Sequence, residues 1–243
     1  DKYVDNTDTL QTIATVSARG EIKDSTGSVV TEIPNLNKWT PIGSYEDETN
    51  NIPFQGVLDG NNKTIRGMYI NYQEGNVYQG LVSYNEGVIK NITLDNGYIY
   101  SAANIEGGIV GYNLNIVDNC KNYVTICSES GQNKWYTGGI VGINNTNAVI
   151  RNCENYGQIS GSMGGGIVGR VEGLMENCKN YGTICGGHGI AGIVCDAYGQ
   201  VVDCINYGNV CGTNSVDSVG GVASWLGSNY LLLNCGNYGA IYS

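Results

Sequence analysis

Short apolar segments recur along the chain from about residue 79 to the C-terminus, and each is flanked by glycine or asparagine. The clearest unit is Gly138–Gly161, in which the segment Gly-Ile-Val-Gly precedes the pattern Asn-Cys-x-Asn-Tyr-Gly. Related units begin at residues 79, 107, 165, 191 and 220. A constant motif separated by connections of variable length is typical of a solenoid, in which each repeat forms one coil.

The apolar segments predict short β-strands. They are about four residues long and rich in glycine, valine, isoleucine and tyrosine, which suits strands better than helical turns. Successive units begin 26 to 31 residues apart. A coil of that length can hold about three short strands with their corners. We therefore predict an all-β fold, a right-handed parallel β-helix, because parallel crossovers are nearly always right-handed.

Residues at equivalent places in successive coils should lie about 4.8 Å apart and form rows. We expect an inward cysteine row, then an asparagine row at a corner, where the amides can bond one another and the turn backbone. A tyrosine row follows, and a stacked spine over the coil edge is favoured over a sugar-binding row. The rows are Cys120, Cys153, Cys178, Cys204 and Cys235; Asn122, Asn155, Asn180, Asn206 and Asn237; and Tyr123, Tyr156, Tyr181, Tyr207 and Tyr238.

The chain has nine cysteines, an odd number spread through the repeats. Neighbours in a row point in parallel and lie a coil apart, whereas a disulfide needs Cβ atoms about 3.8 Å apart. Reduced, packed thiols are therefore favoured, disulfides come second, and reactive or metal-binding thiols come last. Cys127, Cys185 and Cys211 are expected to form a second inward column. With a single histidine, no metal or other cofactor is expected.

The N-terminal part differs from the repeats. We expect residues 1–43 to form a capping region with a short helix over Asp8–Val16, and residues 44–243 to form the β-helix, in one continuous domain. Gln55–Asn71 contains two alternating segments around Asp59-Gly60-Asn61, which predicts two strands joined by a tight turn.

Three stretches together resemble the entry region of bacterial surface proteins that carry GLUG repeats. They are WTPIG at residue 39, FQGVLDGNNKTIRGMYIN at residue 54 and QGLVSYNEGVIKNITL at residue 79, and the later Gly-Ile-Val-Gly segments are similar to the core of that repeat. The resemblance implies a β-helical domain of a large exported bacterial protein, either adhesin-like or the non-catalytic part of an immunoglobulin A protease. The protease motif His-Glu-x-x-His is absent, and the Asn-Cys-x-Asn-Tyr-Gly pattern departs from the family and leaves the ligand undetermined.

The charge balance narrows the possible partners. Twelve basic and 22 acidic residues give a net charge of −10, which opposes nucleic acid, anionic membranes and polyanionic sugars. Neutral glycans, proteins and cations remain compatible. No segment is apolar over the length of a membrane span, and the first residues do not form a signal peptide, so we expect any anchor or export signal outside this sequence.

The candidate catalytic groups of an enzyme are the carboxylates of the repeats, Asp118, Glu154, Glu176 and Asp203. Hydrolysis of a glycoside needs two carboxyl groups about 5–9 Å apart on one face. Solubilising charge copied by the repeat is favoured, because the chain shows no nucleophile–base pair or metal cluster. We therefore expect no catalysis. A polysaccharide lyase or hydrolase, or a spacer of a larger secreted protease, remains the alternative.

The connections between motifs differ in length and suggest a binding groove. Two long ones, Ser128–Thr137 and Thr213–Val219, should form walls over a floor made by Ser162–Gly164 and Gly187–Gly189. The candidate ligand-binding residues are Trp135, Tyr136, His188, Trp225 and Tyr230. Rings of this kind can stack on sugars or anchor a protein, although they can also simply pack onto the coil. The predicted function is an extracellular binding or adhesion module for a glycan or a host protein. The sequence does not determine its oligomeric state.

Overall fold

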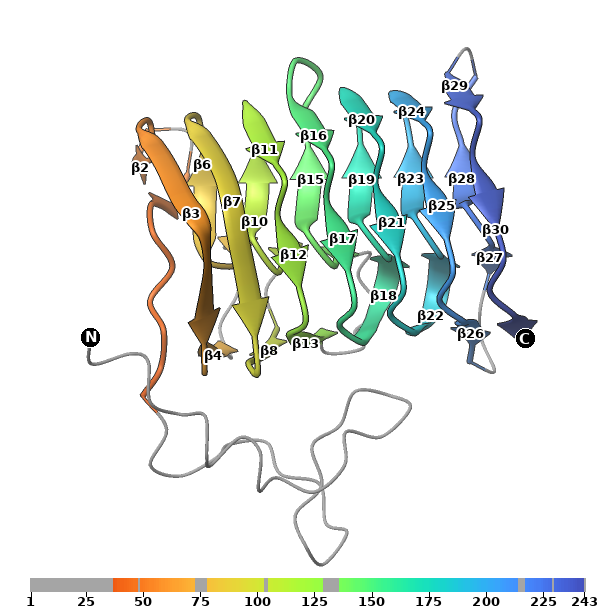
Figure 1. Cartoon of the computed structure of the whole chain (residues 1–243), viewed down its shortest axis with the longest axis horizontal. Helices are drawn as coiled ribbons and strands as arrows, with labels where there is room; N and C mark the ends of the chain where they lie inside the picture. Colours follow the sequence, from red (N-terminus) through yellow and green to blue (C-terminus); the bar gives the residue numbers. More distant parts are fainter. Residues whose placement is uncertain are drawn as a thin grey trace, which may run out of the picture.

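The computed structural model describes residues 37–47, 49–72, 78–102, 105–128, 136–213, 217–228 and 230–242. Within these ranges the chain forms β-strands and no helix. Parallel strands stack into a β-solenoid of about six turns, as the repeats predict, with the N-terminal coils at one end and the C-terminal coil at the other (Figure 1). The helix expected over Asp8–Val16 lies outside the described residues, as does most of the capping region.

One sheet contains the strand of each Gly-Ile-Val-Gly segment or its variant. Its six strands pair in parallel, each with the strand of the next coil. They are β6 (Val82–Asn85), β10 (Val110–Asn113), β15 (Val141–Asn144), β19 (Val168–Val171), β23 (Val194–Ala197) and β28 (Ala223–Leu226).

The second sheet has twelve strands in two rows that share the long strands β3 (Val57–Arg66) and β7 (Val88–Asp95). The first row contains β11 (Ile116–Asp118), β16 (Val149–Arg151), β20 (Leu174–Glu176), β24 (Gln200–Val202) and β29 (Leu231–Leu233). The second row contains β12 (Lys121–Asn122), β17 (Glu154–Asn155), β21 (Lys179–Asn180), β25 (Ile205–Asn206) and β30 (Gly236–Asn237). Between the rows one residue per coil has a left-handed backbone, for example Asn152 with φ of 56°. Asparagine and aspartate tolerate this conformation, and they turn the corner here.

The third sheet has eleven strands and closes the coil. Its main path contains β4 (Tyr69–Tyr72), β8 (Tyr98–Ser101), β13 (Thr125–Ser128), β18 (Ile159–Gly165), β22 (Ile184–Ala191), β26 (Val210–Gly212) and β31 (Ile241–Tyr242). Beside it lie β5 (Tyr78–Gln79), β9 (Ile105–Gly107), β14 (Tyr136–Gly138) and β27 (Ser218–Gly220). A separate antiparallel pair joins β1 (Ser44–Tyr45) and β2 (Asn51–Ile52).

The tight turn predicted at Asp59-Gly60-Asn61 is wrong. Residues on both sides of it belong to one strand, β3, which pairs in parallel with β7 before and after the predicted turn. The register shifts between Asp59 and Lys63, where Asn61 and Asn62 have left-handed backbones. The same residues that favour a hairpin turn therefore make a bend between two faces of the coil, because β7 of the next coil offers pairing partners before and after the bend.

The core is built from one apolar residue row per strand. Cys120, Cys153, Cys178 and Cys204 are fully buried within it, and Cys235 packs against it in the last coil. All nine cysteines are free. The second column, with Cys127 next to the core residue Ile126, does not point inward, because adjacent residues of a strand face opposite sides of the sheet.

The asparagine row connects successive coils through their side chains. The amide of Asn180 donates to Asn206 Oδ1 at 2.8 Å and to the carbonyl of Gly182 at 2.9 Å. In turn, Asn180 Oδ1 accepts from Asn155 at 2.8 Å and from the backbone of Gly182 at 3.2 Å. A buried amide such as that of Asn180 thus forms hydrogen bonds with the backbone of its own turn and with the asparagines of both neighbouring coils.

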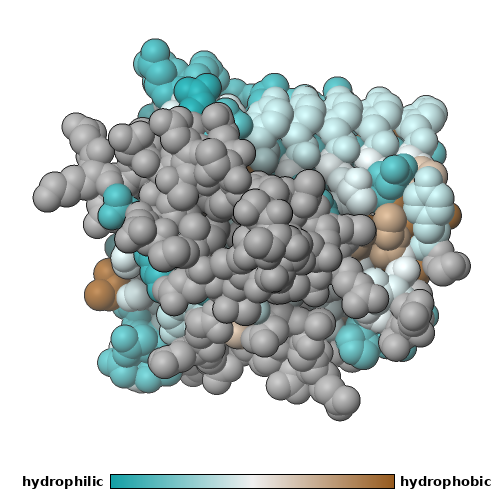
Figure 2. All heavy atoms as spheres, turned by 90° about the horizontal axis from the view of Figure 1, so that it is seen from below, coloured by the Kyte–Doolittle hydropathy of each residue, from teal (hydrophilic) through white to brown (hydrophobic). Residues whose placement is uncertain are grey.

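The tyrosine row stacks along the outside of the corner. Ring centroids are 4.4 Å apart for Tyr123 and Tyr156 and 4.7 Å apart for Tyr156 and Tyr181, with nearly parallel planes. Rows of similar side chains are visible along one edge of the face in Figure 2, and hydrophobic side chains appear at the end that carries the last coil. The exposed apolar residues of that coil include Leu226, Leu233 and Ile241.

Candidate functional site

The residue that follows each Gly-Ile-Val-Gly segment forms a further row, on the six-stranded sheet. Its members align in register from β6 to β28. They are Tyr84, Tyr112, Ile143, Arg170, Asp196 and Trp225. Tyr84, Tyr112 and Arg170 are partly exposed and Trp225 is 48% exposed, so the row reaches the surface at these four positions, whereas Ile143 and Asp196 are buried. We call this row, with the aromatic side chains packed against it, the aromatic face.

At the N-terminal end of the aromatic face four tyrosines line an open pocket. The ring of Tyr78 lies 4.8 Å from Tyr45 and 4.9 Å from Tyr112, and Tyr84 lies within 5.9 Å of Tyr78. The pocket has a volume of about 300 Å³, and Asn51, Leu114 and Asn145 complete its lining. Asn145 donates to the hydroxyl of Tyr112 at 2.9 Å. Burial raises the pKa of Tyr78 above its usual value.

At the C-terminal end a mixed cluster surrounds Arg170. Its guanidinium carbon lies 4.5 Å from the ring centre of Tyr198 and 5.9 Å from that of Tyr136, distances at which a cation attracts an aromatic face. Arg170 also pairs with Glu172 at 2.8 Å. Its Nε is buried and lacks a hydrogen-bond partner among the described residues.

Two further contacts extend this cluster. The hydroxyl of Tyr136 donates to Asp196 Oδ2 at 2.9 Å, and the ring of Tyr198 lies 4.8 Å from Trp225. Tyr230 packs edge-on against Tyr198 at 5.9 Å and remains 44% exposed. The end of the face therefore offers rings, a guanidinium and a carboxylate within a few side chains of one another.

The structure brings some of the candidate residues together. Tyr136, Trp225 and Tyr230 belong to the aromatic face, as described above. His188 does not: it lies on β22, where its Nδ1 is 3.2 Å from Asp217 Oδ2. Trp135 lies outside the described residues, as do residues 129–134 and 214–216 of the expected walls, so the predicted groove stays a prediction.

Sequence reasoning missed most of the aromatic face, namely Tyr45, Tyr78, Tyr84, Tyr112, Arg170 and Tyr198. A signal for part of it is present in the sequence. The position after Gly-Ile-Val-Gly changes from tyrosine to isoleucine, arginine, aspartate and tryptophan, while the cysteine, asparagine and tyrosine rows stay constant. A varied surface position in an otherwise regular repeat is where ligand contacts can be adjusted without disturbing the stack.

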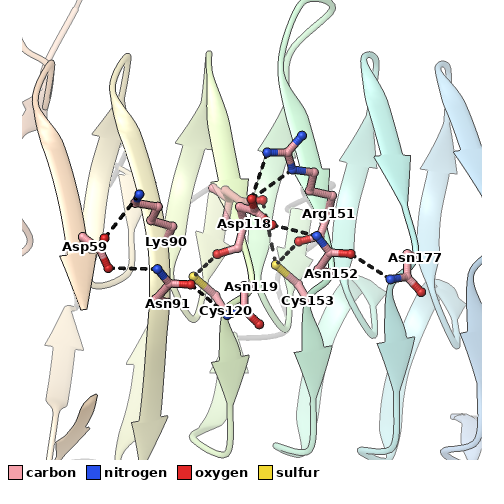
Figure 3. A network of polar contacts seen from close by, with 11 residues as sticks. Asp59, Lys90, Asn91, Asp118, Asn119, Cys120, Arg151, Asn152, Cys153 and Asn177 are labelled. Carbon is pink, nitrogen blue, oxygen red and sulfur yellow. Dashed lines mark hydrogen bonds and ion pairs between the residues drawn. The ribbon is translucent and has the colours of Figure 1, made fainter. Parts of the chain in front are cut away.

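The second sheet carries a row of alternating charge, part of which is drawn in Figure 3. Asp59, Lys90, Asp118, Arg151 and Glu176 occupy one register position in successive coils. Lys90 lies 3.2 Å from Asp59, and Arg151 lies 2.9 Å from Asp118. Partial burial acts to raise the pKa of Asp118, but hydrogen bonds from Arg151 and Asn152 outweigh it, and the pKa is lowered.

The four candidate catalytic carboxylates are thus either placed beside a basic residue or located at a separate position of the coil. Glu154 pairs with Lys121 at 2.7 Å and accepts from the hydroxyl of Tyr156 at 3.0 Å. Glu176 lies opposite Arg151 in register, and Asp203 occupies a left-handed corner. The described residues contain no group of three or more histidine, cysteine or acidic side chains placed to hold a metal ion.

The fold and this site define a parallel β-solenoid with an aromatic outer face. No family model matches the chain. It is similar to Halomucin of Haloquadratum walsbyi, at 33% identity over 116 residues, which are 47% of this chain and 1% of that protein. It is also similar to a protein of Evansella cellulosilytica named "Putative Gly-rich membrane protein", at 36% identity over 85 residues, or 33% of this chain and 9% of the relative.

Among solved structures, the chain resembles a "putative immunoglobulin A1 protease" from Bacteroides ovatus. The TM-score is 0.58 at 20% identity, over 86% of this chain and 74% of the other. At this identity the likeness shows a shared fold. In the part of the chain that the structure describes, no helix is long and apolar enough to cross a membrane.

Proposed function

We propose that this chain is a non-catalytic binding module of an exported bacterial surface protein, and that its aromatic face binds an uncharged glycan. The observation that carries the proposal is the row from Tyr84 to Trp225, which varies in residue type while the structural rows repeat. Six coils at about 4.8 Å spacing make this row about 24 Å long, which suits an extended chain of sugars.

The chemistry of the face matches such a ligand. Sugars present apolar ring faces to aromatic side chains and hydroxyls to polar groups, and Tyr112, Arg170 and Trp225 offer both kinds of contact. The pocket of about 300 Å³ at the N-terminal end can accept one sugar ring. The net charge of −10 disfavours polyanionic sugars.

A surface location is supported by what the relatives are called. One is a halomucin and another is named a membrane protein, and the structural neighbour is named an immunoglobulin A1 protease. The chain covers only a small part of both sequence relatives, which suits a module within a larger protein. The resemblance to GLUG-repeat proteins supports the same assignment.

Enzymatic function has weaker support. Asp118 and Glu154 are held by Arg151 and Lys121, and an ion-paired carboxylate is a poor general acid because its pKa is lowered. We therefore propose binding without turnover.

The test is a glycan array probed with the full 243-residue chain, followed by affinity measurement on any glycan that binds. Tyr112→Ala and Trp225→Ala should each weaken binding at least about tenfold, or about 1.4 kcal/mol, because each removes a stacking surface. Tyr207→Ala is the matched control, since Tyr207 is 42% exposed but belongs to the tyrosine row.

Denaturant unfolding of each variant separates lost binding from lost fold. The proposal fails if the two face variants bind like the wild type while remaining folded. It also fails if Tyr207→Ala weakens binding as much as they do.

A further inference from the structure

The interior of the solenoid contains a polar cluster where β8, β9, β13 and β14 meet. Glu106 is fully buried there, and the hydroxyls of Ser101, Ser128 and Thr137 lie around its carboxyl group. Glu106 pairs in register with Thr137, and Ser101 pairs with Ser128, so two neighbouring coils each contribute two side chains. We call these four residues the Glu106 cluster.

Four polar atoms of this cluster, on three of its residues, are buried without a hydrogen-bond partner among the described residues. They are both carboxyl oxygens of Glu106, Ser128 Oγ and Thr137 Oγ1. A glutamate is almost never fully buried unless it is paired, because an unpaired buried charge is costly. No ion pair joins Glu106 to a basic residue in the part of the chain that the structure describes.

The next coil keeps the hydroxyls unobstructed. Gly161 lies beside the cluster, and a Cβ placed there would come within 2.7 Å of Thr137 Oγ1. Gly164 pairs in register with Thr137. Gly161 therefore leaves room beside the Thr137 hydroxyl, and Gly164 carries no side chain at the register position of Thr137, which Ile190 fills two coils after Thr137.

We propose that the Glu106 cluster binds one small monovalent cation of the Na⁺ type. Carboxylate and hydroxyl oxygens are ligands for hard cations. One monovalent cation neutralises the single carboxylate, whereas a divalent cation would leave an uncompensated positive charge in a medium of low polarity. The site is separate from the aromatic face, and the proposal does not depend on glycan binding.

A proton is the competitor for this cation. Burial raises the pKa of Glu106 well above its usual range, and the three hydroxyls offset only part of that effect. The experiment is therefore run at pH 8, where protonation competes least.

The test measures unfolding of the full chain by denaturant in NaCl, KCl, CaCl₂ and choline chloride at equal ionic strength. For the wild type, each tenfold rise in Na⁺ above its dissociation constant should lower the unfolding equilibrium constant about tenfold. The Glu106→Gln variant should have the same unfolding equilibrium constant in NaCl and in choline chloride. Glu176→Gln, the same change on the outer surface, should respond to Na⁺ like the wild type.

Thr137→Val keeps the carboxylate and removes one ligand, so it should retain the fold with a weaker Na⁺ response. A crystal soaked in Tl⁺ should show an anomalous peak between the four side chains, which gives a readout even if Glu106→Gln does not fold. Equal wild-type stability in NaCl and choline chloride, with no Tl⁺ peak, would show that Glu106 is the neutral acid and overturn the proposal. A response to Ca²⁺ alone, or a Na⁺ response retained by Glu106→Gln, would overturn it too.

Discussion

At the scale of single residues, the second glycine of each pair before an apolar strand is explained by the asparagine row. A Cβ on Gly166 would collide with Asn180 Cγ of the same coil and with the carbonyl of Gly192 in the next. The glycine therefore leaves the space that the buried amide occupies. This links two motifs, Gly-Gly and Asn-Tyr-Gly, that are separate in sequence.

Gly166→Ala should destabilise the protein by about 1–3 kcal/mol, the usual cost of overpacking a rigid interior. Gly164→Ala is the control, because a Cβ there meets its nearest neighbour at 3.6 Å, an ordinary contact. Urea unfolding of both variants gives the comparison. Equal stability of the two variants would contradict the role assigned to Gly166.

At the scale of strands, charge alternates along one register position of the second sheet, from Asp59 to Glu176. Parallel stacking places each residue directly between its counterparts in the coils before and after it. A repeat of like charges would therefore repel along the whole stack, whereas alternation gives each charge opposite neighbours.

The pair of Asp118 and Arg151 should make stability depend on acid pH. Because the folded-state pKa of Asp118 is lowered, its contribution is complete above the unfolded pKa of about 3.9 and is lost as pH falls through the lower folded value. The side chains are 20% and 43% exposed, so the loss should not exceed about 1 kcal/mol. Urea midpoints at pH 7 and pH 3 should differ less in Asp118→Asn than in the wild type.

Asp203→Asn serves as the control for this change. Asp203 occupies a left-handed corner that asparagine occupies in the coils before and after it, and it forms no ion pair within the described residues. The difference between the urea midpoints of Asp203→Asn at pH 7 and pH 3 should equal that of the wild type. If Asp118→Asn also matches the wild type, the ion pair contributes nothing measurable.

At the scale of the whole molecule, stacking removes nearly all thiols from solvent. Seven of the nine cysteines are buried, and only Cys211 and Cys235, near the C-terminal end, are partly exposed. Burial also raises the pKa of the Cys153 thiol well above its usual value, which lowers the fraction of reactive thiolate.

A thiol reagent should therefore modify at most two cysteines rapidly in the native protein and all nine after unfolding in guanidinium. Cys211→Ser and Cys235→Ser together should abolish the rapid phase while leaving the slow phase. Rapid reaction of the row cysteines, or disulfides found by non-reducing mass analysis, would contradict the buried, reduced row.

Some features could be read from the sequence because they repeat. The strands of the Gly-Ile-Val-Gly segments and the parallel solenoid follow from one motif copied at nearly constant spacing. The turn at Asp59-Gly60-Asn61 was predicted wrongly because local residue preferences describe a bend but not its partner. The inward direction expected for Cys127 was wrong for a related reason: counting seven residues from Cys120 ignores the corner between the two strands.

The sequence by itself determined the coil, since each repeat can bury its apolar residues only against the next. The tertiary structure alone decided which side chains from different coil positions meet. Tyr45, Tyr78 and Tyr112 come from three separate segments, and Glu106 faces hydroxyls from three other strands. Such contacts depend on how the corners fold, and corner lengths vary between repeats, so the Glu106 cluster and the aromatic side chains packed against the row of the aromatic face carry no periodic signal of their own.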